Sequence, residues 1–184
     1  MLGAIIGDVA GSYYEVLEIN YFKKNKKPRP YEERIKVLDR NIELFDRNSS
    51  VTDDSILTCS IYDAIKNGNC CYQRYLKEYG LKEMNFGLDI YGRSRFGGNF
   101  CRWLLGNYQG DSFGNGASMR VSPIGYLFDT LDDVRKHARL SCIPSHNNEI
   151  AIKGAECVAC SIFLLRNGYT KEELMKFIKN NYYN

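Results

Sequence analysis

The chain has 184 residues and a mass of 21.2 kDa, so we expect a single domain covering residues 1–184. Apolar residues make up 44% of it and charged residues 26%, proportions that exclude a disordered or collagen-like chain. The net charge is +3, but the segment 23–36 alone holds seven basic and two acidic residues, so no basic surface extends over the remainder and we expect no nucleic-acid partner.

The N-terminal segment predicts neither secretion nor membrane insertion. It begins MLGAIIGDVAGSYYEVL, without a basic n-region, and Asp8 interrupts its apolar run early. No apolar run in the chain approaches the roughly 18 residues that a membrane-spanning helix needs. The seven cysteines lack the regular spacing of a disulfide framework, and free thiols in this number favour a reducing compartment. We therefore expect a cytoplasmic protein with no membrane partner.

The spacing of apolar residues predicts a chain built from helices. The first is expected over 3–17, where apolar positions recur every three or four residues. Residues 20–46 are polar and contain prolines, which predicts a loop with one short element. Further helices are expected at 53–66, 70–83, 99–106, 116–128, 131–141, 148–166 and 171–182. Because strand signals are scarce, the predicted fold class is all-α.

Local start and stop signals support several of these helices. Thr52 can cap the helix over 53–66, and Gly68 follows its end. Thr170 stands three residues before Glu173, which is the spacing of a capping box. A C-x-x-C at 157–160 lies inside the apolar run AECVACSIFLL, so these two cysteines are predicted to be small core residues on a helix rather than zinc ligands.

The first motif that could carry a chemical function lies on the opening helix. Gly3, Gly7 and Gly11 recur at four-residue spacing, which suggests a helix face packed closely against another backbone. Asp8 and Glu15 are two turns apart and point to nearly the same side. Taken alone, the motif favours a packing seam of small residues beside two solvated acids.

The second motif is Thr52-Asp53-Asp54-Ser55 at a helix start. Threonine and aspartate stabilise helix N-termini through capping and the helix dipole, and capping is the better interpretation of this tetrad alone. The functional alternative is a hard-metal site, because carboxylate and hydroxyl oxygens are the ligands that Mg²⁺ and Mn²⁺ prefer.

The third and fourth motifs lie in the second half of the chain. GNGASMR at 114–120 is a glycine loop that opens a predicted helix, so its backbone N–H groups could cradle a phosphate; a plain turn is the alternative. Arg120 either adds positive charge to such a site or makes a structural salt bridge. Ser145-His146 lacks the spacing of a catalytic triad, and a lone histidine is usually a hydrogen-bonded structural residue.

Together and in this order, the motifs resemble a known family. GAIIGDVAGSYYE, TDDS, YGRSRFGGNFCRWL, GNGASMRVSPIG and SHNNEIAIKGA are similar to the signature segments of the ADP-ribosylglycohydrolase family, over residues 3 to about 180. The resemblance implies an all-α fold with a binuclear Mg²⁺ or Mn²⁺ centre in a cleft. It also implies hydrolysis of the bond between ADP-ribose and a protein side chain or a related small-molecule acceptor.

The resemblance also implies roles for individual residues. Thr52, Asp53 and Asp54 match the metal-binding motif, and Glu15 and Asp53 are the implied catalytic acids. The implied phosphate-binding loop consists of Asn115, Gly116, Ala117, Ser118 and Met119. His146 matches a histidine that binds substrate or supports the site. A carboxylate near the ribosyl bond would stabilise oxocarbenium character or deprotonate the attacking water.

One departure from the family pattern concerns the metal ligands. Family members usually continue into a C-terminal half whose D-T-D motif completes the ligand set, and no D-T-D occurs in this chain. We therefore expect an ADP-ribosylglycohydrolase-like fold that is C-terminally truncated. Three interpretations stay open: a truncated or split hydrolase, a chain completed by a second chain or by self-association, and an inactive remnant that binds ADP-ribose or has a structural role.

Overall fold

The computed structural model describes residues 2–38, 44–89 and 92–183, and its contacts divide the chain into two compact units. One unit is Leu2–Thr52, and the other runs from Asp53 to the C-terminus. Every regular element in the described ranges is a helix, and their only extended pairing is an isolated antiparallel bridge between Asp111 and His146. The all-α prediction is confirmed. None of the described helices combines the length and apolarity that crossing a bilayer requires.

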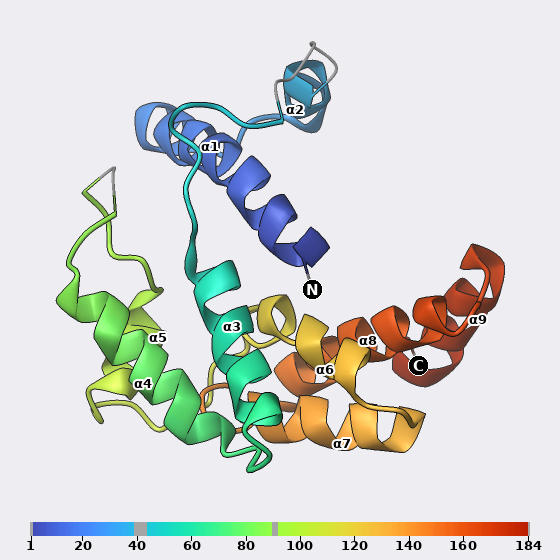
Figure 1. Cartoon of the computed structure of the whole chain (residues 1–184). Helices are drawn as coiled ribbons and strands as arrows, with labels where there is room; N and C mark the ends of the chain where they lie inside the picture. The colour runs from blue at the N-terminus through green and yellow to red at the C-terminus, as the bar shows by residue number, and fades with distance from the viewer. Residues whose placement is uncertain (1, 39–43, 90–91, 184) are drawn as a thin grey trace. The chain divides into compact units, whose positions relative to one another are not determined.

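The Leu2–Thr52 unit contains two helices, drawn in blue in Figure 1. They are α1 (Leu2–Asn25) and α2 (Tyr31–Leu38). The short element predicted within 20–46 is α2, but the prediction of a loop over 20–25 is wrong because α1 continues through these residues. Lys23 and Lys24 lie in the last turn of α1, where positive charge interacts favourably with the helix dipole. Part of the predicted loop, residues 39–43, lies outside the described residues.

Polar contacts tie the connection between α1 and α2 back onto α1. The Arg29 side chain donates to Glu18 at 2.8 Å and lies 4.4 Å from the ring centroid of Tyr21. Arg29 is therefore held against α1, whereas Lys26 and Lys27 before it are exposed. The predicted close packing of the glycine face is not found within this unit: a Cβ added at Gly3, Gly7 or Gly11 would meet nothing within 4 Å.

The second unit contains the remaining helices. They are α3 (Asp53–Lys66), α4 (Tyr72–Asn85), α5 (Gly98–Leu104), α6 (Ser122–Leu127), α7 (Leu131–Cys142), α8 (Glu149–Arg166) and α9 (Lys171–Tyr182). The single helix predicted over 116–128 is wrong, because a 3₁₀ turn at Ser118–Arg120 and then α6 occupy this stretch. Pro123 lies in the first turn of α6 and lacks the N–H that a continuous helix would need.

The core of this unit forms around α3, α6, α7 and α8. The helices α7 and α8 pack along each other, and α3 contacts α4 and α6 (Figure 1). Fully buried side chains from these helices include Leu57, Ile61, Ile124, Val134 and Ile152. At Gly125, α6 approaches α8 so closely that an added Cβ would lie 2.6 Å from the carbonyl oxygen of Ala159. The loop before α6 therefore leads into a helix that packs closely on α8.

The start of α9 and the character of the cysteines are as predicted. Thr170 and Glu173 form the complete capping box at the start of α9. The seven cysteines are all free thiols. Cys160 on α8 is fully buried and Cys157 is partly buried, which confirms that the C-x-x-C belongs to a helix facing the core.

Candidate functional site

A cavity of about 390 Å³ lies within the unit that begins at Asp53. This volume is typical of a site for a small organic ligand. The lining residues come from the start of α3, the start of α5 and two loops: Asp53, Leu57, Gly97, Gly98, Asn99, Phe100, Ser112, Asn115, Gly116, Met119, Ser145 and His146. Segments that are up to 93 positions apart in sequence, from Asp53 to His146, therefore share one cavity.

Five of the residues singled out in the sequence line this cavity. They are Asp53, Asn115, Gly116, Met119 and His146. Two neighbours in the glycine loop face elsewhere. Ala117 is fully buried in the hydrophobic core, and the Ser118 hydroxyl packs against Gly154 of α8. Asp54, also on α3, is partly buried and is not among the lining residues.

The glycine loop leads into a single 3₁₀ turn, not into a long helix. The N–H of Met119 donates to the carbonyl of Asn115 at 3.2 Å, and this bond closes the loop. Gly116 has no room for a side chain, because an added Cβ would lie 2.9 Å from Nε2 of His146. The glycine loop therefore approaches the imidazole most closely at Gly116, where only a residue without a side chain fits.

The backbone at 146–147 pairs with the backbone at 110–111. His146 forms the antiparallel bridge with Asp111, and the N–H of Asn147 donates to the carbonyl of Gly110 at 2.7 Å. Gly110 has a φ of 80° and is buried, and a Cβ there would collide with the carbonyl oxygen of Pro144. Glycine is thus required for the turn that brings 110–111 against 146–147.

Arg120 fulfils neither role predicted for it. It does not line the cavity, and its guanidinium is fully buried, without an ion pair to any described residue. One terminal nitrogen donates to the Ser141 carbonyl and to Ser145 Oγ, each at 2.8 Å. Burial lowers the pKa of Arg120 to about 10, so the side chain stays charged near neutral pH.

Burial and the nearby Arg120 cation lower the pKa of His146 from 6.5 to about 4. The unfolded chain therefore binds more protons than the folded chain between these two values, and stability rises with pH across that window. We expect the free energy of unfolding to fall by about 3 kcal/mol from about pH 7.5 to pH 4 through this group alone.

Urea denaturation at several pH values would measure this effect. The matched control is His146→Gln, which keeps a polar side chain but cannot titrate. The difference in unfolding free energy between the two proteins should shrink as the pH falls. A difference that is independent of pH would contradict the prediction.

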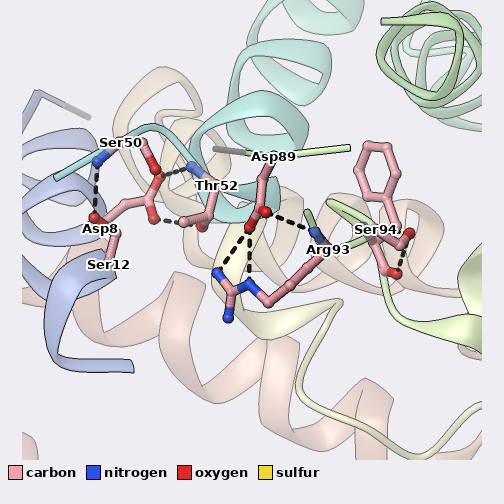
Figure 2. Close-up of polar contacts among 8 residues, drawn as sticks. Asp8, Ser12, Ser50, Thr52, Asp89, Arg93 and Ser94 are labelled. Carbon is pink, nitrogen blue, oxygen red and sulfur yellow. Dashed lines mark hydrogen bonds and ion pairs between the residues drawn. The ribbon is translucent and has the colours of Figure 1, made fainter. Parts of the chain in front are cut away.

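In the Leu2–Thr52 unit, Asp8 holds the predicted metal ligand Thr52. The N–H and the hydroxyl of Thr52 donate to the two carboxylate oxygens of Asp8, at 3.0 and 2.5 Å (Figure 2). The N–H of Ser50 donates to the hydroxyl of Ser12 at 2.9 Å, one turn further along α1. Asp8 is thus not the solvated acid that the sequence suggested. Glu15 is exposed on the same helix.

Asp8→Ala should release the segment 50–52 from α1, because two charge-assisted hydrogen bonds are lost together. We expect backbone amide exchange of Thr52 to accelerate on the order of tenfold, which corresponds to about 1.4 kcal/mol. Hydrogen exchange followed by mass spectrometry would detect this. Glu15→Ala, an exposed acid on the same helix, is the control and should leave the exchange unchanged; equal rates in both variants would oppose the assignment.

A second polar cluster braces the loop that leads to the cavity wall. Arg93 donates from its backbone N–H and its Nε to the two oxygens of Asp89, at 2.8 and 2.9 Å (Figure 2). The hydroxyl of Ser94 donates to the carbonyl of Phe96 at 3.0 Å. These contacts directly precede Gly97, where the cavity lining begins.

The donors present fit a hard cation in kind but not in number. Thr52, Asp53 and Asp54 carry hydroxyl and carboxylate oxygens, and the Thr52 oxygen keeps lone pairs because its proton goes to Asp8. Across the described ranges, no three His, Cys, Asp or Glu side chains gather in a metal-binding group. Mg²⁺ needs about six ligands. These residues supply only part of such a set, so no chemical step is assigned to a metal.

Sequence reasoning missed the part of the wall formed by the start of α5. Gly97, Gly98, Asn99 and Phe100 lie within the motif YGRSRFGGNFCRWL, which carried no chemical assignment. Two adjacent glycines before an aromatic residue are the signal that could have indicated a backbone open to a ligand. Ser112, in the loop before the GNG motif, was also missed and had no such signal.

Comparison with known proteins adds a family assignment. The model of a family described as ADP-ribosylglycohydrolase matches residues 1–183. ADP-ribosylhydrolase ARH3 of Homo sapiens is 26% identical over 196 aligned positions, covering 94% of this chain and 50% of the human protein. The Mus musculus protein of the same name is 36% identical over 62 positions, covering 34% of this chain and 17% of its own length. The chain thus spans about half the length of the human relative.

Proposed function

The chain belongs to the ADP-ribosylglycohydrolase family, and from this premise we propose that it hydrolyses the bond that joins ADP-ribose to a modified acceptor. The acceptor would be a protein side chain or a small molecule. In the reaction, a water oxygen bonds to the anomeric carbon of the ribose, the bond to the acceptor breaks, and the acceptor leaves with a proton.

The observation that carries this proposal is the make-up of the cavity. A carboxylate from the start of α3, a glycine loop and an imidazole converge on one space of about 390 Å³. A nucleotide sugar presents a scissile ribosyl bond, a diphosphate and hydroxyl groups. The carboxylate suits the ribosyl bond, the glycine loop suits the diphosphate, and the imidazole suits a hydroxyl group. Asp53, the loop at Asn115 and Gly116, and His146 are the residues concerned.

We assign the roles as follows. Asp53 and Glu15 are the acids that would stabilise positive charge on the ribose or take a proton from water. The loop Asn115–Met119 would bind the diphosphate, and because that contact is remote from the reacting carbon, its binding energy would position the sugar. His146 would donate a hydrogen bond to the ligand. Ala117 and Ser118 contribute through their backbone, since their side chains are turned away from the cavity.

A divalent cation belongs to the proposal as a bound group. Mg²⁺ or Mn²⁺ would orient ribose hydroxyls and favour ionisation of a bound water. Thr52, Asp53 and Asp54 would contribute oxygen ligands, and further ligands are needed to complete two sites. Calorimetry with Mn²⁺ alone, on wild type and on Asp54→Asn, would test the ligand role without any turnover. Equal Mn²⁺ affinity in the two proteins would oppose it.

The test of the function itself separates binding from hydrolysis. Isothermal titration with ADP-ribose should give saturable binding, and incubation with ADP-ribosylated arginine, serine and small-molecule acceptors plus Mg²⁺ or Mn²⁺ should release ADP-ribose. Binding without release on every acceptor would favour the inactive ADP-ribose-binding remnant. If the protein neither binds ADP-ribose nor releases it from any acceptor, both the hydrolase and the ADP-ribose-binding remnant are overturned. That result would favour a purely structural role.

A further inference from the structure

Three buried polar groups form a continuous chain that ends at the cavity. Nη2 of Arg120 donates to Oγ of Ser145 at 2.8 Å, and that oxygen lies 2.8 Å from Nδ1 of His146. Arg120 and Ser145 are each at least 99% buried, and His146 is 5% exposed. Ser145 and His146 both line the cavity, whereas Arg120 does not.

Counting protons along this chain determines which histidine nitrogen carries hydrogen. Arginine only donates, so Ser145 Oγ accepts from Arg120 and must place its own proton elsewhere. The only hydrogen-bond acceptor that any described residue offers to that hydroxyl is Nδ1 of His146. A buried hydroxyl without an acceptor costs roughly 1–3 kcal/mol, so the proton goes to Nδ1. Nδ1 is therefore an acceptor, and the imidazole proton resides on Nε2.

The opposite edge of the ring is available to a ligand. Nε2 makes no hydrogen bond to the described residues, and it faces Gly116 across the gap where a Cβ would lie 2.9 Å away. His146 and Gly116 both line the cavity. We propose that Arg120 and Ser145 are positioning residues that hold His146 as its Nε2–H tautomer, so that this N–H is donated to an acceptor oxygen of the ligand.

Electrostatics favour the same arrangement. A proton on Nδ1 of His146 would point toward the Ser145 hydroxyl, which already accepts a hydrogen bond from the buried Arg120 cation. The positive charge of Arg120 therefore disfavours a proton on Nδ1. The depressed pKa of His146, caused by burial and by Arg120, agrees with a neutral ring.

Packing alone does not account for Arg120. A fully buried guanidinium is costly, and its Nε and Nη1 have no hydrogen-bond partner among the described residues. An apolar side chain of similar volume would fill the same space with less desolvation. The retained cation is explained if its hydrogen bond to Ser145 serves the site. This inference rests on the proposed function for the identity of the ligand, but the tautomer is a property of the free protein.

Nitrogen-15 NMR of the imidazole rings tests the tautomer directly. The chain has two histidines, so His137→Gln assigns the remaining signals to His146. In the wild type at neutral pH we expect a deprotonated, hydrogen-bonded Nδ1 and a protonated Nε2, with no second tautomer. In Ser145→Ala, the Nδ1 shift should move to that of a nitrogen without a hydrogen bond, and both tautomers should become populated. A wild-type ring protonated on Nδ1, or a mixture, would overturn the proposal.

Matched variants separate positioning from stability. Ser141→Ala removes a neighbouring buried hydroxyl that bonds only within α7, and it should leave the His146 signals unchanged. Ser145→Thr retains the hydroxyl and should restore the wild-type spectrum if it folds, as judged by circular dichroism. Should Ser145→Ala fail to fold, the wild-type spectrum alone still tests whether the proton of His146 resides on Nε2.

Titration with ADP-ribose gives the functional readout. We expect Ser145→Ala to bind on the order of tenfold more weakly, with Ser141→Ala unaffected. Unchanged affinity together with an altered tautomer would overturn the positioning role. If wild type does not bind ADP-ribose at all, the proposed function fails, whereas the tautomer result still stands or falls independently.

Discussion

Asp53→Ala should reduce the release of ADP-ribose by a factor on the order of 10² or more, while the protein remains folded. Asp53 is the one acid that lines the cavity among the described residues. Its removal would take away the charge that stabilises the ribosyl cation or activates water, and no neighbouring carboxylate in the lining replaces it. Product release from an ADP-ribosylated acceptor, measured at saturating substrate, is the test.

The control for this variant addresses the capping interpretation of TDDS. Asp53 lies in the first turn of α3, and Asp132 lies in the first turn of α7, so each acid interacts with a helix dipole. Loss of either should cost about 0.3–1 kcal/mol of stability. Asp132→Ala should keep full activity because Asp132 is exposed away from the cavity. Equal activity in Asp53→Ala and Asp132→Ala would reduce Asp53 to a helix-capping residue.

Gly110→Ala should be the most destabilising single change near the site. Two costs combine: φ of 80° is unfavourable for alanine, and the new Cβ would collide with the carbonyl oxygen of Pro144. We expect a loss of about 3 kcal/mol or more in the free energy of unfolding, and a drop in melting temperature of roughly 6–12 °C. Thermal and urea denaturation would measure both.

Gly106→Ala is the control that separates the two costs. Gly106 has a φ of 78°, but nothing lies within 4 Å of an added Cβ. The free energy of unfolding of this variant should fall only by the cost of placing alanine at a positive φ, about 1 kcal/mol. If both alanine variants lose the same stability, the clash with Pro144 is relieved by movement of the turn, and Gly110 does not hold 110–111 against 146–147 as described.

Helix boundaries could be predicted where local chemistry determines them. The start of α9 follows from the Thr170–Glu173 capping box, and the end of α3 is followed by Gly68 with a positive φ. Both signals are confined to a few neighbouring residues. The two errors have different causes. Residues 20–25 are polar enough for a loop, yet α1 continues through them beside the contact between Arg29 and Glu18. Over 116–128, one helix was expected, but the stretch holds a 3₁₀ turn and then α6, with Pro123 in the first turn of α6. This proline is a local signal that favours a helix start at this point.

The candidate site, like the helices, could be predicted only in part. Motif order identified candidates of which Asp53, Asn115, Gly116, Met119 and His146 line one cavity. The side chains of Ala117 and Ser118, from the same glycine loop, face elsewhere. The role of Arg120 could not be predicted, because nothing in GNGASMR indicates that its last residue turns inward, away from the loop that precedes it. Its partner Ser145 is 25 positions away, and only the folded packing of α7 brings the two together. Hydrogen-bond networks of this kind depend on distances that a sequence does not contain.

The close crossing of α6 and α8 restricts how far sequences with this fold can diverge. At Gly125 an added Cβ would lie 2.6 Å from the backbone carbonyl oxygen of Ala159, which is present whatever residue occupies position 159. It would also lie 2.8 Å from Cβ of Ile162, an atom that every residue except glycine carries. Position 125 should therefore remain glycine across evolutionary time even where surface residues have changed beyond recognition. We therefore expect distant homologues to carry a glycine two residues after the Pro123 position.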